Sequence, residues 1–156
     1  MKKWISLIII FLMCASMSAC VTDKNDNMDA YAGNTYVGTS PWGEEVSVAV
    51  KNYDAEEETI DLIYTENIDS EHTLKIDWSG LMVGKNSVAI GCAGSREEDG
   101  YGVEYKYDLN MEFKNQTITL TYLDGQKTEL SSEGGSGFHQ VGALSEEEKT
   151  ILLERK

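Results

Sequence analysis

The chain has 156 residues, and its 27 acidic and 13 basic side chains give it a formal net charge of −14 at pH 7. With 41% hydrophobic and 26% charged residues, it has the composition of one globular domain, too apolar for a disordered acidic chain and too polar for a multi-span membrane protein. A chain this acidic repels phosphate backbones, which excludes nucleic acid as a partner.

The N-terminus reads as a secretion signal. Lys2 and Lys3 form a short positive region, and residues 4–13 form an apolar run interrupted only by Ser6. A membrane-spanning helix needs about 20 apolar residues, so this shorter run indicates a signal peptide instead.

A cysteine motif follows the apolar run. Met17, Ser18 and Ala19 precede Cys20, and this tetrapeptide resembles the lipobox of bacterial lipoproteins. The resemblance implies that signal peptidase II removes residues 1–19 and that Cys20 carries a diacylglycerol group and an N-acyl chain such as palmitate. It also implies a lipid anchor on the extracytoplasmic face of a bacterial cell membrane or outer membrane. Ordinary secretory cleavage after Ala19 is the alternative, and the large Met17 side chain fits its small-x-small rule poorly.

Cleavage and acylation would leave one thiol. Cys14 leaves with the signal peptide and Cys20 is acylated, so Cys92 has no partner for a disulfide within the chain. Cys92 shares its alternation with Val88 and Ile90, which predicts a buried, inert thiol and not a catalytic one.

Residues 20–33 are polar and show no regular period, which predicts a flexible, lipidated tether. From residue 34 onward the dominant pattern has a period of two. Five segments place hydrophobic residues at alternate positions: Val46, Val48 and Val50; Ile60, Leu62 and Tyr64; Leu74, Ile76 and Trp78; the odd positions from Val103 to Phe113; and Ile118, Leu120 and Tyr122. This pattern predicts strands with one buried face and one wet face.

The strands are separated by hairpin-sized breaks. Lys114-Asn115 leaves room for a two-residue turn, and Asp124-Gly125 is a dipeptide that type I′ turns favour. No helical period occurs before Gly142, which excludes a parallel sheet with crossover helices. Residues 34–156 are therefore predicted to form one all-β domain, an antiparallel meander of about eight strands closed into a small up-and-down barrel or folded into a sandwich.

The last twelve residues depart from the strand pattern. Ser145 and Glu148 have the spacing of a capping box, and Ile151, Leu152 and Leu153 supply an apolar face. A short helix over residues 145–156 is predicted to dock against the sheet.

The sequence offers little catalytic chemistry. It has no G-x-S-x-G elbow, no phosphate-binding glycine loop, and only two histidines, His72 and His139, with one spare thiol. No catalytic residue, metal site or cofactor is predicted, and the chain is not expected to be an enzyme.

Two sets of residues are candidates for binding. The first is aromatic and lies on the apolar phase of its strands, so that in a closed barrel it points inward: Tyr64, Trp78, Tyr105, Tyr107 and Tyr122. Such rings with polar tips suit a pocket for an amphiphilic ligand, although they could also simply fill the core.

The second set is charged and lies in a glycine-rich segment, residues 91–102, which is predicted to be a loop. Its charged residues could recognise a basic partner or hold a hydrated cation: Arg96, Glu97, Glu98 and Asp99.

A lipobox followed by a small acidic meander beginning at residues 34–42 looks like the lipocalin-like lipoproteins of bacterial cell envelopes, although the lipocalin G-x-W signature is absent around Trp42. The outline is also similar to periplasmic lysozyme inhibitors, which are small β-barrel lipoproteins. The first resemblance implies a membrane-anchored, non-catalytic module that binds a small amphiphilic ligand. The second implies an acidic interaction or inhibitor protein directed at a cationic envelope protein such as a lysozyme-like hydrolase. An open, tyrosine-lined cavity would favour the first function, and a filled core with protruding acidic loops the second.

Overall fold

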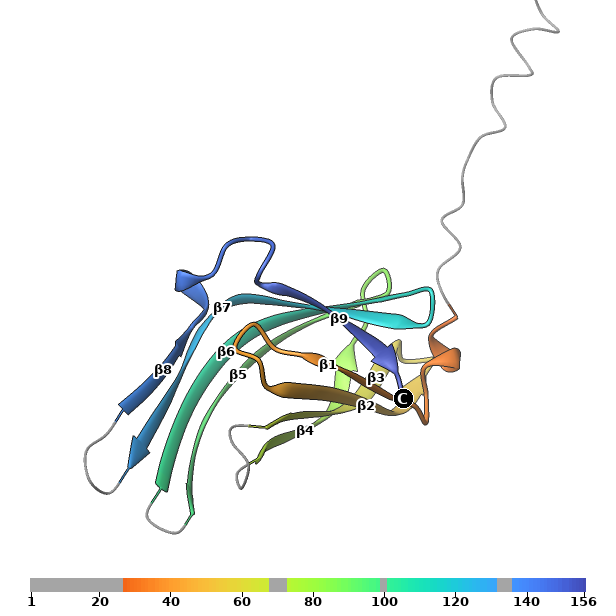
Figure 1. Ribbon diagram of the computed structural model, residues 1–156. Coiled ribbons are helices and arrows are strands. Elements are labelled where there is room, and N and C mark those ends of the chain that lie inside the picture. Colours follow the sequence, from red (N-terminus) through yellow and green to blue (C-terminus); the bar gives the residue numbers. More distant parts are fainter. Residues whose placement is uncertain (1–26, 68–72, 99–100, 132–135) are drawn as a thin grey trace, which may run out of the picture.

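The computed structural model describes residues 27–67, 73–98, 101–131 and 136–156. Over these residues the chain forms one antiparallel sheet of nine strands with two single 3-10 turns, η1 (Met28–Ala30) and η2 (Val141–Ala143), and no longer helix (Figure 1). The strands are β1 (Thr35–Thr39), β2 (Glu45–Asp54), β3 (Thr59–Asn67), β4 (Thr73–Met82), β5 (Ser87–Glu98), β6 (Tyr101–Lys114), β7 (Thr117–Ser131), β8 (Ser136–Gln140) and β9 (Thr150–Arg155).

The sheet curls into a nearly closed barrel. Its strand order is β4-β3-β2-β1-β9-β7-β6-β5, and β8 adds to the outer part of β7. The two ends of this order, β4 and β5, follow each other in the chain and pair only at the bridge between Gly84 and Ser87 in their connecting turn. The predicted all-β antiparallel meander is confirmed, with one strand more than expected.

The alternation of hydrophobic and polar residues along each strand determines which side chains form the core. The inward positions predicted for β2, β3, β7 and the described part of β6 are buried, whereas on the edge strand β4 only Leu74 is fully buried, and Ile76 and Trp78 are half-buried. Each of these strands therefore turns its apolar phase to the barrel interior and its polar phase to solvent.

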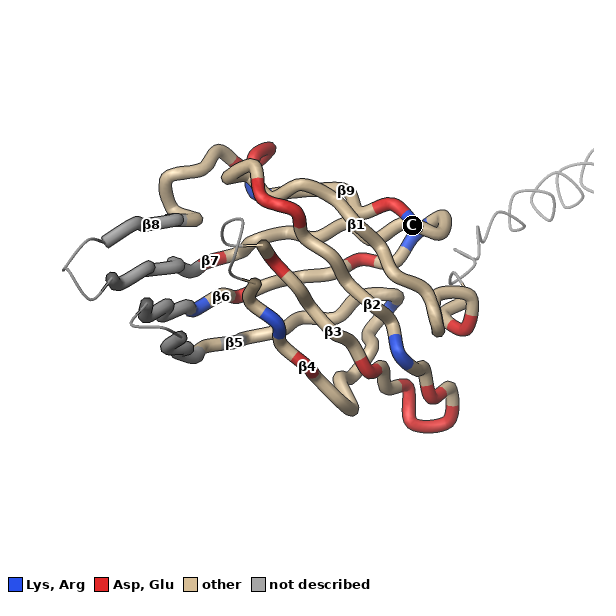
Figure 2. Tube along the Cα trace, turned by 60° about the horizontal axis from the view of Figure 1, so that its bottom comes forward, with Lys and Arg blue, Asp and Glu red and all other residues tan. Residues whose placement is uncertain are grey.

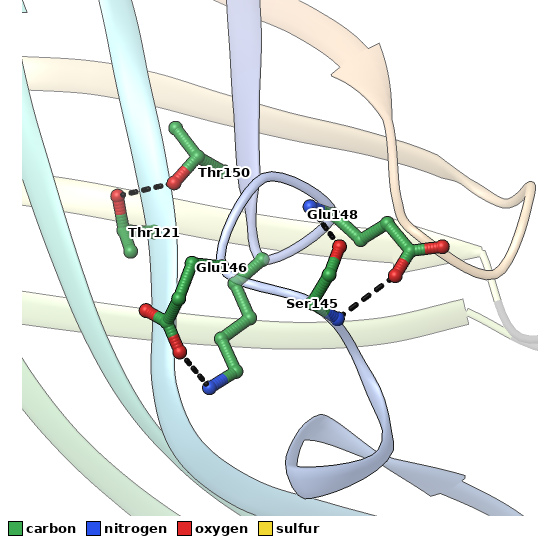
Figure 3. Close-up of polar contacts among 6 residues, drawn as sticks. Thr121, Ser145, Glu146, Glu148 and Thr150 are labelled. Atoms are coloured by element: carbon green, nitrogen blue, oxygen red, sulfur yellow. Dashed lines mark hydrogen bonds and ion pairs between the residues drawn. The ribbon is translucent and has the colours of Figure 1, made fainter.

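The predicted C-terminal helix over residues 145–156 is wrong. The capping box forms as expected, with the Ser145 amide donating to Glu148 Oε2 at 2.8 Å and the Glu148 amide donating to Ser145 Oγ at 3.3 Å (Figure 3). The chain makes only one turn, however, and then continues as β9, where the Tyr122 amide donates to the Lys149 carbonyl oxygen and Ile118 pairs with Leu153. As a strand this segment satisfies the backbone of both β1 and β7, which a docked helix could not do.

A glycine permits β9 to fit between those strands. A Cβ atom at Gly38 in β1 would lie 2.6 Å from Leu153 Cδ2 and 2.7 Å from the Leu152 carbonyl oxygen, both closer than real Cβ contacts. Only glycine leaves room for β9 at this point.

The tether prediction for residues 20–33 is also wrong at its C-terminal end. Met28 and Tyr31 are buried in the core, and the Tyr31 ring lies 5.6 Å from Tyr36 and 5.2 Å from Phe113, centroid to centroid. These two large apolar side chains stabilise a segment that otherwise looks like a linker. The predicted signal peptide (residues 1–19) and the rest of the predicted tether (residues 20–26) lie outside the described residues.

One predicted turn is displaced and another is absent. The β6–β7 hairpin turns at Asn115 and Gln116, whose φ values of 53° and 62° fit a type I′ turn one residue later than expected. Asp124 and Gly125 do not turn at all, because β7 continues through them with a bulge, at which the extra residue Leu123 is 55% exposed. No helix in the described part of the chain has the length and apolar character needed to cross a membrane.

Candidate ligand-binding site

The antiparallel order gives the barrel two distinct ends. One, here called the closed end, carries η1, the turns β2–β3, β4–β5 and β6–β7, and the C-terminus (Figure 1). The other, here called the loop end, carries the β1–β2 loop, residues 40–44. The aromatic candidates lie toward the loop end, and Tyr31 and Met28 fill the closed end.

Three tyrosines from three strands meet inside the barrel toward the loop end. Tyr64 comes from β3, Tyr107 from β6 and Tyr122 from β7, and each side chain is 0% exposed. The ring centroids of Tyr107 and Tyr122 are 5.6 Å apart with their planes at 66°, an edge-to-face arrangement. In this region the barrel interior is thus filled by aromatic rings with polar tips.

The tyrosine hydroxyls connect to a buried carboxylate. The Tyr64 hydroxyl lies 3.3 Å from Glu66 Oε2, to which it donates, and 3.1 Å from the Tyr122 hydroxyl. Because the single proton of Tyr64 points to Glu66, the Tyr122 hydroxyl is the donor to Tyr64. Glu66 is itself 0% exposed, so a carboxylate and two hydroxyls form one hydrogen-bonded chain in the core.

The surroundings keep Tyr64 neutral. Burial raises the pKa of the Tyr64 hydroxyl well above its ordinary value of 10.0, and the neighbouring Tyr122 and the Glu66 carboxylate raise it further. Tyr64 therefore remains a hydrogen-bond donor at any physiological pH.

Two tryptophans separate this polar interior from solvent. Trp42 lies 5.3 Å from Tyr122 and 6.4 Å from Tyr107, and Trp78 lies 6.1 Å from Tyr64, measured between ring centroids. Both tryptophans are partly exposed, whereas the tyrosines behind them are not. A ligand entering the barrel from the loop end would meet Trp42 first.

The β1–β2 loop holds Trp42 in place. The hydroxyl oxygen of buried Ser40 accepts from the amides of Trp42 at 3.3 Å and Glu44 at 3.1 Å. The Ser40 amide donates to the Glu44 carbonyl oxygen at 2.7 Å, and the Gly43 amide donates to the Ser40 carbonyl oxygen at 3.0 Å. Trp42 is therefore positioned by a hydrogen-bonded loop and not only by contact with the rings below it.

The structure thus brings together four of the five aromatic residues predicted from the sequence, Tyr64, Trp78, Tyr107 and Tyr122, whereas the side chain of Tyr105 lies outside the described part. Sequence reasoning missed Trp42 and Glu66. Glu66 could have been identified from the sequence, because inward-facing residues on a strand occur at every second position and Glu66 follows Ile60, Leu62 and Tyr64 at that spacing. Nothing local distinguishes Trp42, because its loop has no periodic pattern.

The predicted acidic loop over residues 91–102 is wrong as a loop. Arg96, Glu97 and Glu98 lie on β5 and pair with β6 up to Tyr101, so both strands continue almost to the hairpin tip. Asp99 lies outside the described residues, as do the side chains of these three neighbours.

The two cysteine predictions remain untested. Cys92 lies on β5 opposite Tyr107, but its side chain is not among those described, so its burial and inertness stay a prediction. Cys20, the expected lipid attachment point, precedes the described residues.

Two open clefts lined by described residues lie on the closed end, on either side of η1. One has a volume of about 410 Å³ and is bordered by Met28, Tyr53 and Val83, and the other, of about 460 Å³, is bordered by Tyr31 and Gln116. Over the same described residues, no group of three or more histidine, cysteine or acidic side chains is arranged to hold a metal ion.

Comparison of the sequence with protein-family models, and of the chain with curated proteins and solved structures, found no match.

Proposed function

We propose that this chain is a lipid-anchored protein of the bacterial cell envelope that binds a small amphiphilic ligand, without catalysis, at the loop end of its barrel. The observation that carries the proposal is the hydrogen-bonded chain of Tyr122, Tyr64 and Glu66 inside the buried core. Apolar side chains would fill that space at lower cost, since each buried polar group loses its hydration. Polar groups that converge among aromatic rings are typical of ligand sites.

The aromatic rings give the proposed site its apolar wall. Trp42 and Trp78 already shield the tyrosines from solvent, and displacement of Trp42 by a hydrocarbon tail would keep the same surfaces out of water. The polar head of an amphiphile would then replace or extend the hydrogen bonds of the tyrosine hydroxyls.

The lipid anchor would set the orientation of the barrel. Cys20 and Asn27 are seven positions apart in the sequence, so the acylated cysteine can lie at most about 25 Å from the start of the barrel. The described chain begins at the closed end, next to η1. The closed end would therefore face the bilayer, and the loop end with its aromatic site would face away from it.

The anchor is tested by Cys20→Ser, which removes the acylated sulfur. The expected result is release of the protein from the membrane fraction or accumulation of uncleaved precursor, with Cys14→Ser as the matched control that leaves fractionation unchanged. Wild-type behaviour of Cys20→Ser, including partition into detergent, would contradict the lipoprotein proposal.

The binding site is tested by tryptophan fluorescence of the acylated protein without residues 1–19, in which Trp4 is absent and Trp42 and Trp78 emit. The protein is placed in nanodiscs whose scaffold protein lacks tryptophan, with empty discs as the blank for partition into lipid. Titration with 1-octanol, a neutral amphiphile, is expected to change the emission of Trp42 and Trp78 in a saturable manner. In Trp42→Phe the amplitude should fall while saturation persists, because a phenyl ring still covers the site. A purely linear response, equal to that of the blank, would contradict ligand binding at the loop end.

A second candidate function, an inhibitor of a cationic envelope protein such as a lysozyme-like hydrolase, is favoured by two observations: the aromatic rings fill the interior toward the loop end, and an acidic turn projects between β2 and β3 (Figure 2). Glu56, Glu57 and Glu58 are exposed there, and the Asp54 carboxylate fixes the turn by accepting from the amides of Glu56 at 2.9 Å and Glu57 at 3.1 Å. Such a rigid acidic projection could attract a basic partner. Salt-dependent binding of lysozyme that is lost on replacing the three glutamates with glutamine would support it, and binding unchanged by this replacement would contradict it.

A further inference from the structure

The position of Glu66 in the sheet makes its carboxylate chemically unusual. Its register partners are Val46 on β2 and Leu74 on β4, both buried apolar residues. A leucine would pack between them without the cost of removing a carboxylate from water. Even a well-paired buried charge seldom adds stability over a hydrophobic side chain of similar size, so its presence here points to a role other than folding.

The rings linked to this carboxylate carry negative potential on their faces and positive potential on their edges. The Tyr122 ring meets Trp42 at an interplanar angle of 71° and Tyr107 at 66°, and the Tyr122 hydroxyl joins Tyr64 and, through it, Glu66. Aromatic faces carry negative electrostatic potential and attract ammonium groups, most strongly when water is excluded. The carboxylate and the ring faces therefore favour the same kind of guest.

The residues near the entrance to the site are negatively charged as well. Glu44 and Glu45 follow Trp42 and Gly43 at the loop end, and the whole chain carries a net charge of −14. This field concentrates cations near the barrel mouth and repels anions from it.

We propose that the ligand bound by this site is a cationic amphiphile, whose ammonium group binds against the Tyr107 and Tyr122 rings once its tail has displaced Trp42, with Glu66 as its counter-charge. This inference rests on the proposed amphiphile-binding function and specifies the head group that such a ligand carries. A carboxylate or phosphate head group would bring like charge against Glu66 and would be rejected, and a neutral head group would gain hydrogen bonds only.

The test compares three probes with the same hydrocarbon chain: octyltrimethylammonium, 1-octanol and octanoate. The two charged probes are titrated below their micellar concentrations and 1-octanol below its solubility limit, into the acylated protein without residues 1–19 in nanodiscs, with tryptophan emission as the readout and empty discs as the blank. The wild-type chain should bind octyltrimethylammonium at least about tenfold more tightly than 1-octanol, and octanoate least tightly.

Two variants, each lacking one carboxylate, test which residue causes the preference for the cationic probe. Glu66→Gln replaces the buried carboxyl by an amide of the same shape that cannot serve as a counter-charge, and it should bring the affinity for octyltrimethylammonium down to about that for 1-octanol. Glu154→Gln removes one charge from an exposed position on β9 and should leave the order of the three probes unchanged. Thermal unfolding of both variants checks that they fold, and if Glu66→Gln does not fold, the ranking of the three probes on the wild-type chain decides the matter.

The outcomes separate this inference from the function on which it rests. Saturable binding of 1-octanol with no preference for the cation would overturn the inference and leave the binding function in place, as would an undiminished preference in a folded Glu66→Gln variant. Absence of saturable binding for all three probes would overturn both.

Discussion

Gly38→Ala tests whether β9 truly fills the gap between β1 and β7. The added methyl would lie 2.6 Å from Leu153 Cδ2 and 2.7 Å from the Leu152 carbonyl oxygen. Leu153 is 0% exposed, and the Leu152 carbonyl belongs to the strand backbone, so β9 itself must shift. Such overpacking costs about 1–3 kcal/mol, partly offset by the roughly 0.4–1 kcal/mol that Gly→Ala gains by restricting the unfolded chain.

The expected net loss is therefore about 1–2 kcal/mol, a measurable part of the roughly 5–15 kcal/mol that stabilises a domain of this size. It is measured as a lower urea midpoint at unchanged slope. Gly84→Ala is the matched control, because a Cβ atom there meets nothing within 4 Å, and its midpoint should stay the same or rise. A Gly38→Ala midpoint equal to or above that of the wild type would refute the placement of β9 against β1.

Three further predictions concern the barrel wall, the core and the C-terminal turn. Leu109→Asp places a carboxylate on the buried face of β6 and should lower the free energy of unfolding by several kcal/mol. Asn110→Ala, on the outer face, should change it by less than about 0.5 kcal/mol. Similar shifts of the denaturant midpoint in both variants would contradict the assignment of the two faces of β6. Tyr36→Phe removes a buried hydroxyl that has no hydrogen-bond partner among the described residues. Denaturant unfolding should therefore give a free energy of unfolding that is unchanged or higher by up to about 1 kcal/mol. A clear decrease in that free energy would show that the hydroxyl is paired. The hydrogen bonds with Ser145 lower the pKa of the Glu148 carboxyl from its ordinary value of 4.5. Their contribution to folding is therefore present above pH 4.5 and is lost as the pH falls through the pKa of the folded state. Glu148→Gln should remove this part of the acid sensitivity, and a Glu148 carboxyl that titrates by NMR at the ordinary value would contradict the prediction.

The period-two patterns were sufficient to predict the strands whose two faces differ. Val46, Val48 and Val50 lie inward as their alternation predicts, and so do Tyr107 and Leu109. These positions are set by local chemistry, because a strand with one apolar face can bury only that face.

The errors arose where the outcome depends on distant parts of the chain. The capping box at Ser145 and Glu148 forms as its local pattern predicts, yet the residues after it become a strand because β1 and β7 leave a gap that only a strand can close. Asp124-Gly125 likewise has the composition of a turn, but pairing with β6 continues through it. Tertiary hydrogen bonding overrode the local preference in both cases.

The candidate site was predicted only in part for the same reason. The inward phase of the strands identified Tyr64, Tyr107 and Tyr122, but the sequence could not show that Glu66 would lie at hydrogen-bond distance from Tyr64 between apolar neighbours. Trp42 lies on a loop, and its contact with Tyr122 joins residues 80 positions apart, so only the folded barrel brings them together.

The most direct test of the account is a titration of the isotopically labelled chain in nanodiscs, followed through the indole N–H signals of Trp42 and Trp78 and the backbone amides of Met28 and Tyr31 in two-dimensional NMR spectra. With octyltrimethylammonium as the probe, the two indole signals should shift saturably with one common affinity, while the amides at the closed end stay in place. Shifts confined to Met28 and Tyr31, next to the two open clefts, would place binding at the wrong end of the barrel and contradict the proposed site.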